Sequence, residues 1–147
     1  MIERRRADLP ASSSLQDGPP PILLLAKDLE SPKAAREFAR AFIAYHDPGA
    51  SEDYVEAVVL VVCELVTNSV RYGTEPGDSL RVTLSVDDTR TRVEVRDPVR
   101  RRPRLRPASV QRDRGRGLII LDALCPGSWG VDDAPFGKTV WAEVKGS

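Results

Sequence analysis

The chain has 147 residues, with 22 basic and 22 acidic side chains, and 41% of its residues are apolar. This size and composition suit one globular domain with its own core. The zero net charge argues against general nucleic-acid binding, which usually needs a basic excess, and no apolar run is long enough to cross a membrane. Cys63 and Cys125 stand in apolar surroundings without metal-ligand spacing, which favours free thiols in a reducing compartment and therefore a cytoplasmic protein.

The first half of the chain predicts a tail, a strand and two helices. Residues 1–20 are rich in proline, serine and charge, so we expect a flexible tail before a domain over 21–147. The apolar run Ile22–Leu25 suits an edge strand. Ser31, followed by a proline, is the expected N-cap of a helix that ends before Asp47. The second helix is predicted from its N-cap Ser51 to Gly73, and its interior over 57–63 is apolar all round, which predicts burial on every side.

The second half of the chain predicts two hairpins separated by a loop and a short helix. Ser79–Val86 and Thr91–Asp97 alternate at period two around a turn, which is typical of a β-hairpin. An irregular stretch to Arg114, a helix over Gly117–Leu124 and a closing hairpin near Trp129 and over Thr139–Val144 follow. This order predicts an α+β two-layer α/β sandwich, in which helices cover one face of a mixed, largely antiparallel sheet.

Two polar side chains follow the apolar stretch of the second helix. Glu64 and Asn68 are four residues apart and therefore lie on one helix face. An unpaired polar group on a buried helix costs about 1–3 kcal/mol, so the pair is expected to line a polar cavity or to contact a ligand. The alternative is that the helix emerges into water at this point and both side chains are solvated.

Asp97 provides an independent indication of a site. Val93, Val95 and Asp97 share one face of their strand, and the apolar members require that face to be the buried one. The carboxylate therefore points inward at the strand end, where it can accept hydrogen bonds from an amine such as that of adenine. The alternative is a capping aspartate that satisfies the turn at Pro98.

The segment after Asp97 has the composition of a phosphate-binding loop. The stretch from Pro98 to Arg114 holds seven arginines and one aspartate, and arginine suits the forked hydrogen bonding of phosphates. Loops of this length are uncommon unless they are lids or binding loops, although a basic loop without a binding role is the alternative. Gly115-Arg116-Gly117 then opens a helix, where backbone amides can bind an anion, but most such glycine pairs are plain turns.

These segments, in this order, resemble the GHKL ATPases, which include histidine kinases, gyrase B and MutL. The sequence is most similar to the anti-sigma-factor serine/threonine kinases of the RsbW/SpoIIAB type, which have the Bergerat or histidine-kinase-like ATPase fold. The likeness covers roughly residues 22–145 and rests on ELVTNSVRYG (64–73), Asp97, GRGLIILDAL (115–124) and GKTVW (137–141). The sequence departs from the family pattern after Asp97, where Pro98-Val99 replaces a common glycine.

The resemblance implies a role for each matching residue. Asn68 would ligate Mg²⁺ between the phosphates of ATP, and Glu64 would orient or deprotonate the attacking hydroxyl as the catalytic base. Asp97 would read adenine with the help of Thr139. The remaining implied nucleotide contacts are Arg71, Gly115, Arg116, Gly117 and Leu118.

Two functions follow from the resemblance. The first is an anti-sigma factor that uses Mg-ATP to phosphorylate a serine or threonine of a STAS-domain anti-sigma-factor antagonist, with a sigma factor as the other partner. The second is a non-catalytic, ATP-responsive binding module that sequesters a sigma factor or another regulatory partner. Neither involves direct nucleic-acid or membrane contact, and both are compatible with a homodimer.

Overall fold

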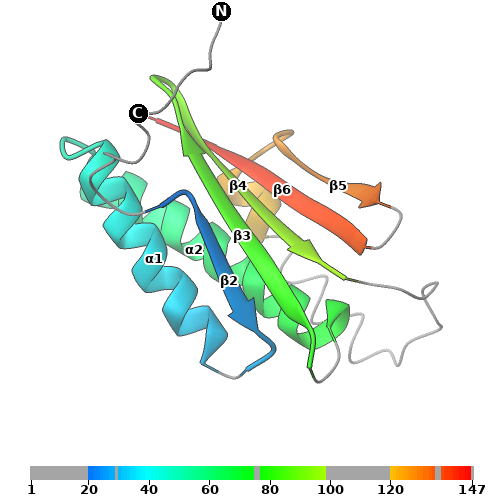
Figure 1. Cartoon of the computed structure of the whole chain (residues 1–147). Helices are drawn as coiled ribbons and strands as arrows, with labels where there is room; N and C mark the ends of the chain where they lie inside the picture. The colour runs from blue at the N-terminus through cyan, green and yellow to red at the C-terminus, as the bar shows by residue number, and fades with distance from the viewer. Residues whose placement is uncertain (1–19, 29, 75–76, 99–119, 135–136, 147) are drawn as a thin grey trace, which may run out of the picture.

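The computed structural model describes residues 20–28, 30–74, 77–98, 120–134 and 137–146. Within these residues, one sheet has the strand order β2-β3-β4-β6-β5, and neighbouring strands are antiparallel. Helices α1 (Ser31–His46) and α2 (Glu52–Asn68) pack side by side on one face of this sheet (Figure 1). The predicted α+β sandwich is therefore confirmed. The strands are β2 (Ile22–Ala26), β3 (Ser79–Val86), β4 (Arg90–Asp97), β5 (Trp129–Ala134) and β6 (Gly137–Lys145).

Helix α1 begins one residue earlier than the sequence predicts. Glu30, and not Ser31, is the N-cap, because the chain already turns at Asp28, whose carboxylate accepts the Glu30 amide at 2.8 Å. The Ser31 hydroxyl instead donates to the Ala26 carbonyl at 2.6 Å. The expected capping serine therefore ties the start of α1 to the end of β2.

Helix α2 begins where the sequence predicts, and the chain changes from α-helix to π-helix after it. The Ser51 hydroxyl accepts the Tyr54 amide at 3.1 Å, as an N-cap should. The chain remains helical up to Gly73, but residues Ser69–Gly73 form a π-helical turn. The expectation of burial on every side was wrong for one stripe, since Leu60 is 42% exposed. Helix α1 and the sheet cover the other sides of α2, and Leu60 faces neither.

Alternation along the central strands divides the sheet into a core face and an open face. In β4, Thr91, Val93, Val95 and Asp97 are buried while the residues between them are half-buried. Residues 120–124 are helical, and Leu121 belongs to the same core. On the open face the Arg92 guanidinium lies 4.5 Å from the centre of the Trp141 ring. No described helix is long and apolar enough to span a bilayer.

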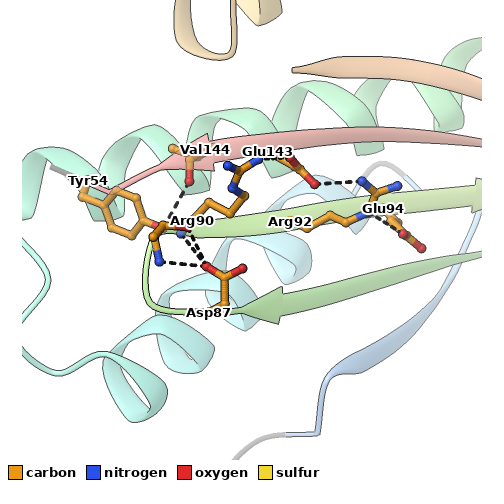
Figure 2. Close-up of polar contacts among 8 residues, drawn as sticks. Tyr54, Asp87, Arg90, Arg92, Glu94, Glu143 and Val144 are labelled. Atoms are coloured by element: carbon orange, nitrogen blue, oxygen red, sulfur yellow. Dashed lines mark hydrogen bonds and ion pairs between the residues drawn. The ribbon is translucent and has the colours of Figure 1, made fainter. Parts of the chain in front are cut away.

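The β3–β4 turn end of the sheet is fixed by internal polar contacts (Figure 2). Asp87 accepts the amides of Thr89 and Arg90 at 2.8 and 2.9 Å, and these bonds lower the pKa of its carboxyl group. The Glu143 carboxylate accepts hydrogen bonds from the guanidinium groups of Arg90 at 2.6 Å and Arg92 at 3.0 Å. These bonds lower the pKa of Glu143. These polar groups therefore form hydrogen bonds with one another and stabilise this end of the sheet.

The Tyr54 hydroxyl joins α2 to the sheet near this same end. It is hydrogen-bonded to the Thr91 hydroxyl and lies 3.4 Å from the Val144 carbonyl oxygen (Figure 2). Burial raises the pKa of the Tyr54 hydroxyl. The contact connects the first turn of α2 to two neighbouring strands, β4 and β6.

Candidate functional site

Asp97 ends β4 on the core face, and its side chain is 1% exposed. The Ser69 hydroxyl donates to its Oδ2 atom at 3.2 Å, and the Lys138 ammonium lies 3.8 Å from the same oxygen. A buried carboxylate is costly unless cations and donors compensate the loss of water. The sequence argument that Asp97 points inward is confirmed, and residues from three separate segments meet at this strand end.

Strand β6 approaches Asp97 closely because residue 137 is a glycine. A Cβ atom built on Gly137 would lie 2.1 Å from the Asp97 carbonyl oxygen, which no side chain tolerates. The next residue, Lys138, pairs directly with Asp97 and so shares its face of the sheet. Thr139 pairs with Arg96 and lies on the opposite face. The structure therefore brings Lys138, and not the expected Thr139, to Asp97.

The π-helical turn that supplies Ser69 is fixed by two neighbouring side chains. The Lys27 ammonium, just beyond β2, donates to the carbonyls of Val70 at 2.6 Å and Thr74 at 3.0 Å. The Thr74 hydroxyl donates to the carbonyls of Ser69 at 3.1 Å and Val70 at 3.2 Å. These bonds satisfy carbonyls that a helix end leaves without partners and hold Ser69 against Asp97.

Glu64 and Asn68 lie on the last two turns of α2, and both are half-buried. Within the part of the chain that the structure describes, neither side chain forms a hydrogen bond or an ion pair. Asn68 directly precedes Ser69, so its backbone adjoins that of the residue that donates to Asp97. The structure thus brings Asn68 and Asp97 to one end of the sheet. Glu64 lies one turn further from that end, and Arg71 is exposed on the π-helical turn.

Four of the predicted site residues lie outside the described part of the chain. They are Gly115, Arg116, Gly117 and Leu118, and the arginine-rich segment that was predicted to be a lid is outside it from residue 99 onward. Pro98, the first residue of that segment, is described and directly follows Asp97. The sequence alone therefore places the start of the segment at the buried carboxylate.

A separate hollow of about 770 Å³ opens at the other end of the sheet. It lies between the end of α1 and the β3–β4 turn, and its walls include Phe42, Tyr45, His46, Asp87 and Asp88. Strand β4 separates it from Asp97 by about 23 Å at 3.3 Å per residue. None of the predicted site residues that the structure describes line it, so it is distinct from the Asp97 end of the sheet.

Sequence reasoning missed Ser69 and Lys138, although periodicity contained a signal for both. Ser69 is four residues after the buried Leu65, so it continues the core face of α2. Lys138 is two residues before Val140 in a row that continues through the buried Ala142. Asp97 was identified as a polar residue that continues the apolar face of its strand. Applying the same criterion to α2 and β6 identifies Ser69 and Lys138.

A comparison with known families assigns most of the chain to one of them. Residues 25–141 match the sequence model of the family described as histidine kinase-like ATPase domain, and no curated protein matches the chain. The matched region begins within β2 and ends within β6. It therefore includes Ser69, Asp97 and Lys138.

Proposed function

Because the chain belongs to the histidine kinase-like ATPase family of GHKL proteins, which bind ATP, we propose that it is an anti-sigma factor with serine/threonine kinase activity. Its substrate would be a STAS-domain anti-sigma-factor antagonist, and its second partner a sigma factor. The observation that carries the proposal is the buried Asp97 carboxylate, which lies beside the segment 64–73 and at the start of the arginine-rich segment. In this proposal Asp97 accepts a hydrogen bond from the adenine amine.

The described residues fit a magnesium nucleotide. The half-buried Asn68 amide makes no hydrogen bond within the described chain, so its oxygen is available to a cation. The described residues contain no cluster of three or more acidic, histidine or cysteine ligands. Mg²⁺ commonly takes one or two protein oxygens and completes its shell with phosphate and water. In this proposal Asn68 would hold the Mg²⁺ ion, and the ion would offset the negative charge of the phosphates.

In the proposed phosphoryl transfer, Glu64 acts as a base that removes one proton. The substrate hydroxyl oxygen forms a bond to the terminal phosphorus as the bond to ADP breaks, and Glu64 takes the hydroxyl proton. Positioning and charge stabilisation dominate such reactions, so few catalytic side chains are needed. Arg71, Gly115, Arg116, Gly117 and Leu118 are proposed to hold the phosphates. Glu64 suits the role because no described residue competes for its carboxylate.

The test measures Mg-ATP binding by calorimetry and transfer of labelled phosphate to candidate STAS-domain proteins. Glu64→Gln should leave the Kd for ATP within about threefold and reduce transfer by about 10²–10⁴-fold, as expected for loss of a general base. Asp97→Asn should abolish binding, because the new amide can place a donor against the donor of adenine. Asn68→Ala should weaken Mg-ATP binding more than metal-free ATP binding. Glu56→Gln, on an exposed part of the same helix, is the matched control and should behave as wild type.

Two outcomes would contradict the kinase proposal. If wild type binds ATP and a sigma factor but transfers phosphate to no antagonist, the protein is an ATP-responsive binding module. If Glu64→Gln loses ATP binding, Glu64 is structural and is not the base.

A further inference from the structure

Lys138 forms an ion pair with the proposed adenine-reading carboxylate. Its Nζ atom lies 3.8 Å from Asp97 Oδ2, and the two side chains are 18% and 1% exposed. We infer that Lys138 is a second base-reading residue, whose ammonium donates to the N1 atom of adenine while Asp97 accepts from the neighbouring amine. This inference rests on the proposed nucleotide binding and assigns a role that the sequence motifs had given to Thr139.

The chemistry of the pair matches the edge of the base. Adenine presents a donor, its exocyclic amine, directly beside an acceptor, N1. A carboxylate is an acceptor with about four sites, and an ammonium carries three donors and no acceptor. Asp97 and Lys138 therefore offer one acceptor and one donor on the same face of neighbouring strands. Their separation exceeds the roughly 2.7–2.9 Å of a direct charge-assisted hydrogen bond, so the pair lies at ion-pair range.

The fold fixes both members of this pair. Ser69 holds Oδ2 of Asp97, and Gly137 lets the β6 backbone contact the Asp97 carbonyl one residue before Lys138. The stem of Lys138 continues the apolar row of Val140 and Ala142, which suits a side chain with an apolar stem and a charged end. The ammonium is therefore carried to the end of the sheet, beside the carboxylate.

A purely structural ion pair is the competing explanation. In that case Lys138 only compensates the buried charge of Asp97, and it affects the binding affinities of ATP and its analogue equally. The two explanations differ when the N1 atom is removed from the ligand. The probe is 1-deaza-ATP, in which a C–H group replaces N1 while the amine and the phosphates remain.

The experiment compares the Kd values of ATP and 1-deaza-ATP by calorimetry. Wild type should bind 1-deaza-ATP about 10–100-fold more weakly, which is the range for a hydrogen bond to a charged group. Lys138→Met, which keeps the apolar stem, should bind both nucleotides with the same Kd. Lys138→Arg should restore discrimination. Lys145→Met, at the exposed end of the same strand, should match wild type.

Comparing two ligands on one variant removes any effect of reduced stability on affinity. If Lys138→Met weakens both nucleotides equally and still discriminates between them, Lys138 acts only through the charge of Asp97 and the inference is overturned. If wild type binds both nucleotides equally tightly, Lys138 does not read N1, although the proposed ATP binding stands. Failure of wild type to bind ATP would overturn both proposals.

Discussion

Single residues determine whether the Asp97 end of the sheet can form. A carboxylate that is 1% exposed loses its hydration, and in this fold a serine hydroxyl and a lysine ammonium replace it. The lysine reaches Asp97 because the backbones of β4 and β6 approach closely. Gly137 is the residue that permits the approach, because no side chain fits between it and the Asp97 carbonyl.

Replacing Gly137 should therefore destabilise the protein and disturb the site together. Gly137→Ala forces the β6 backbone away from Asp97, and overpacking of this kind typically costs about 1–3 kcal/mol. The melting temperature should fall by about 3–10 °C for a domain of this size. Gly49→Ala is the control, because its added methyl group meets nothing within 4 Å. Equal melting temperatures for the two variants would show that β6 has room to move.

The two cysteines should differ in reactivity because their surroundings differ. Cys125 is buried, and burial raises the pKa of its thiol from 9.0 to about 11. Cys63 is partly exposed, and Arg36 Nη1 lies 3.4 Å from its sulfur. We expect iodoacetamide at pH 8 to alkylate Cys63 well before Cys125, because the thiolate is the reactive form. Mass spectrometry of time points measures the order, and faster reaction of Cys125 would contradict it.

The raised pKa of Cys125 also sets the sign of its effect on stability. The folded thiol keeps its proton between pH 9 and about 11, while the unfolded thiol loses it in that window. The contribution to the free energy of unfolding is therefore complete below pH 9 and is lost as the pH rises toward 11. Cys125→Ala should remove this part of the alkaline dependence in urea titrations.

At the scale of elements, the π-helical turn Ser69–Gly73 connects the scaffold to the site. A π-turn bonds i to i+5 and so inserts an extra residue into the helical path, and such turns are frequent at functional sites. Here the turn carries Ser69 to Asp97, while Lys27 and Thr74 bind its free carbonyls. The lysine comes from beyond β2, so the edge of the sheet stabilises the end of α2.

Loss of the Lys27 ammonium should therefore destabilise the π-helical turn as well as remove its own hydrogen bonds. Lys27→Met leaves the carbonyls of Val70 and Thr74 without its hydrogen bonds. We expect the free energy of unfolding to fall by about 1.5–3 kcal/mol, the range for hydrogen bonds to charged groups. The exposed Lys33 on α1 provides the control, since Lys33→Met should change stability by less than about 0.5 kcal/mol. Urea unfolding of both variants tests the difference.

The elements themselves could be predicted from the sequence because their signals are local. Alternation in Ser79–Val86 and Thr91–Asp97 was sufficient to predict the hairpin and the inward direction of Asp97. The exposed stripe at Leu60 could not be predicted in this way, because it depends on where α1 packs. Ser31 was misassigned as a cap because its true acceptor, the Ala26 carbonyl, belongs to the preceding strand.

At the scale of the whole molecule, the sequence did not predict the site residues whose position depends on the pairing of strands distant in the sequence. Asp97, Glu64 and Asn68 were selected from local patterns. The pairing of Asp97 with Lys138, in preference to Thr139, depends on how β6 aligns with β4. A shift of one residue would exchange the two faces of β6. Local composition does not determine that alignment, whereas the close approach at Gly137 does.

The strand order has a consequence for the kinetics of folding. The β3–β4 and β5–β6 hairpins and the α1–α2 pair are local in the sequence, whereas β6 joins β4 across the whole stretch from 98 to 136. Closing the long connection between β4 and β6 costs entropy, so we expect Lys138 to meet Asp97 only after the rate-limiting barrier. Gly137→Ala should then speed unfolding roughly tenfold and leave the folding rate nearly unchanged, which stopped-flow measurements in urea can determine. The candidate site would thus be the last part of the domain to form and the first to open.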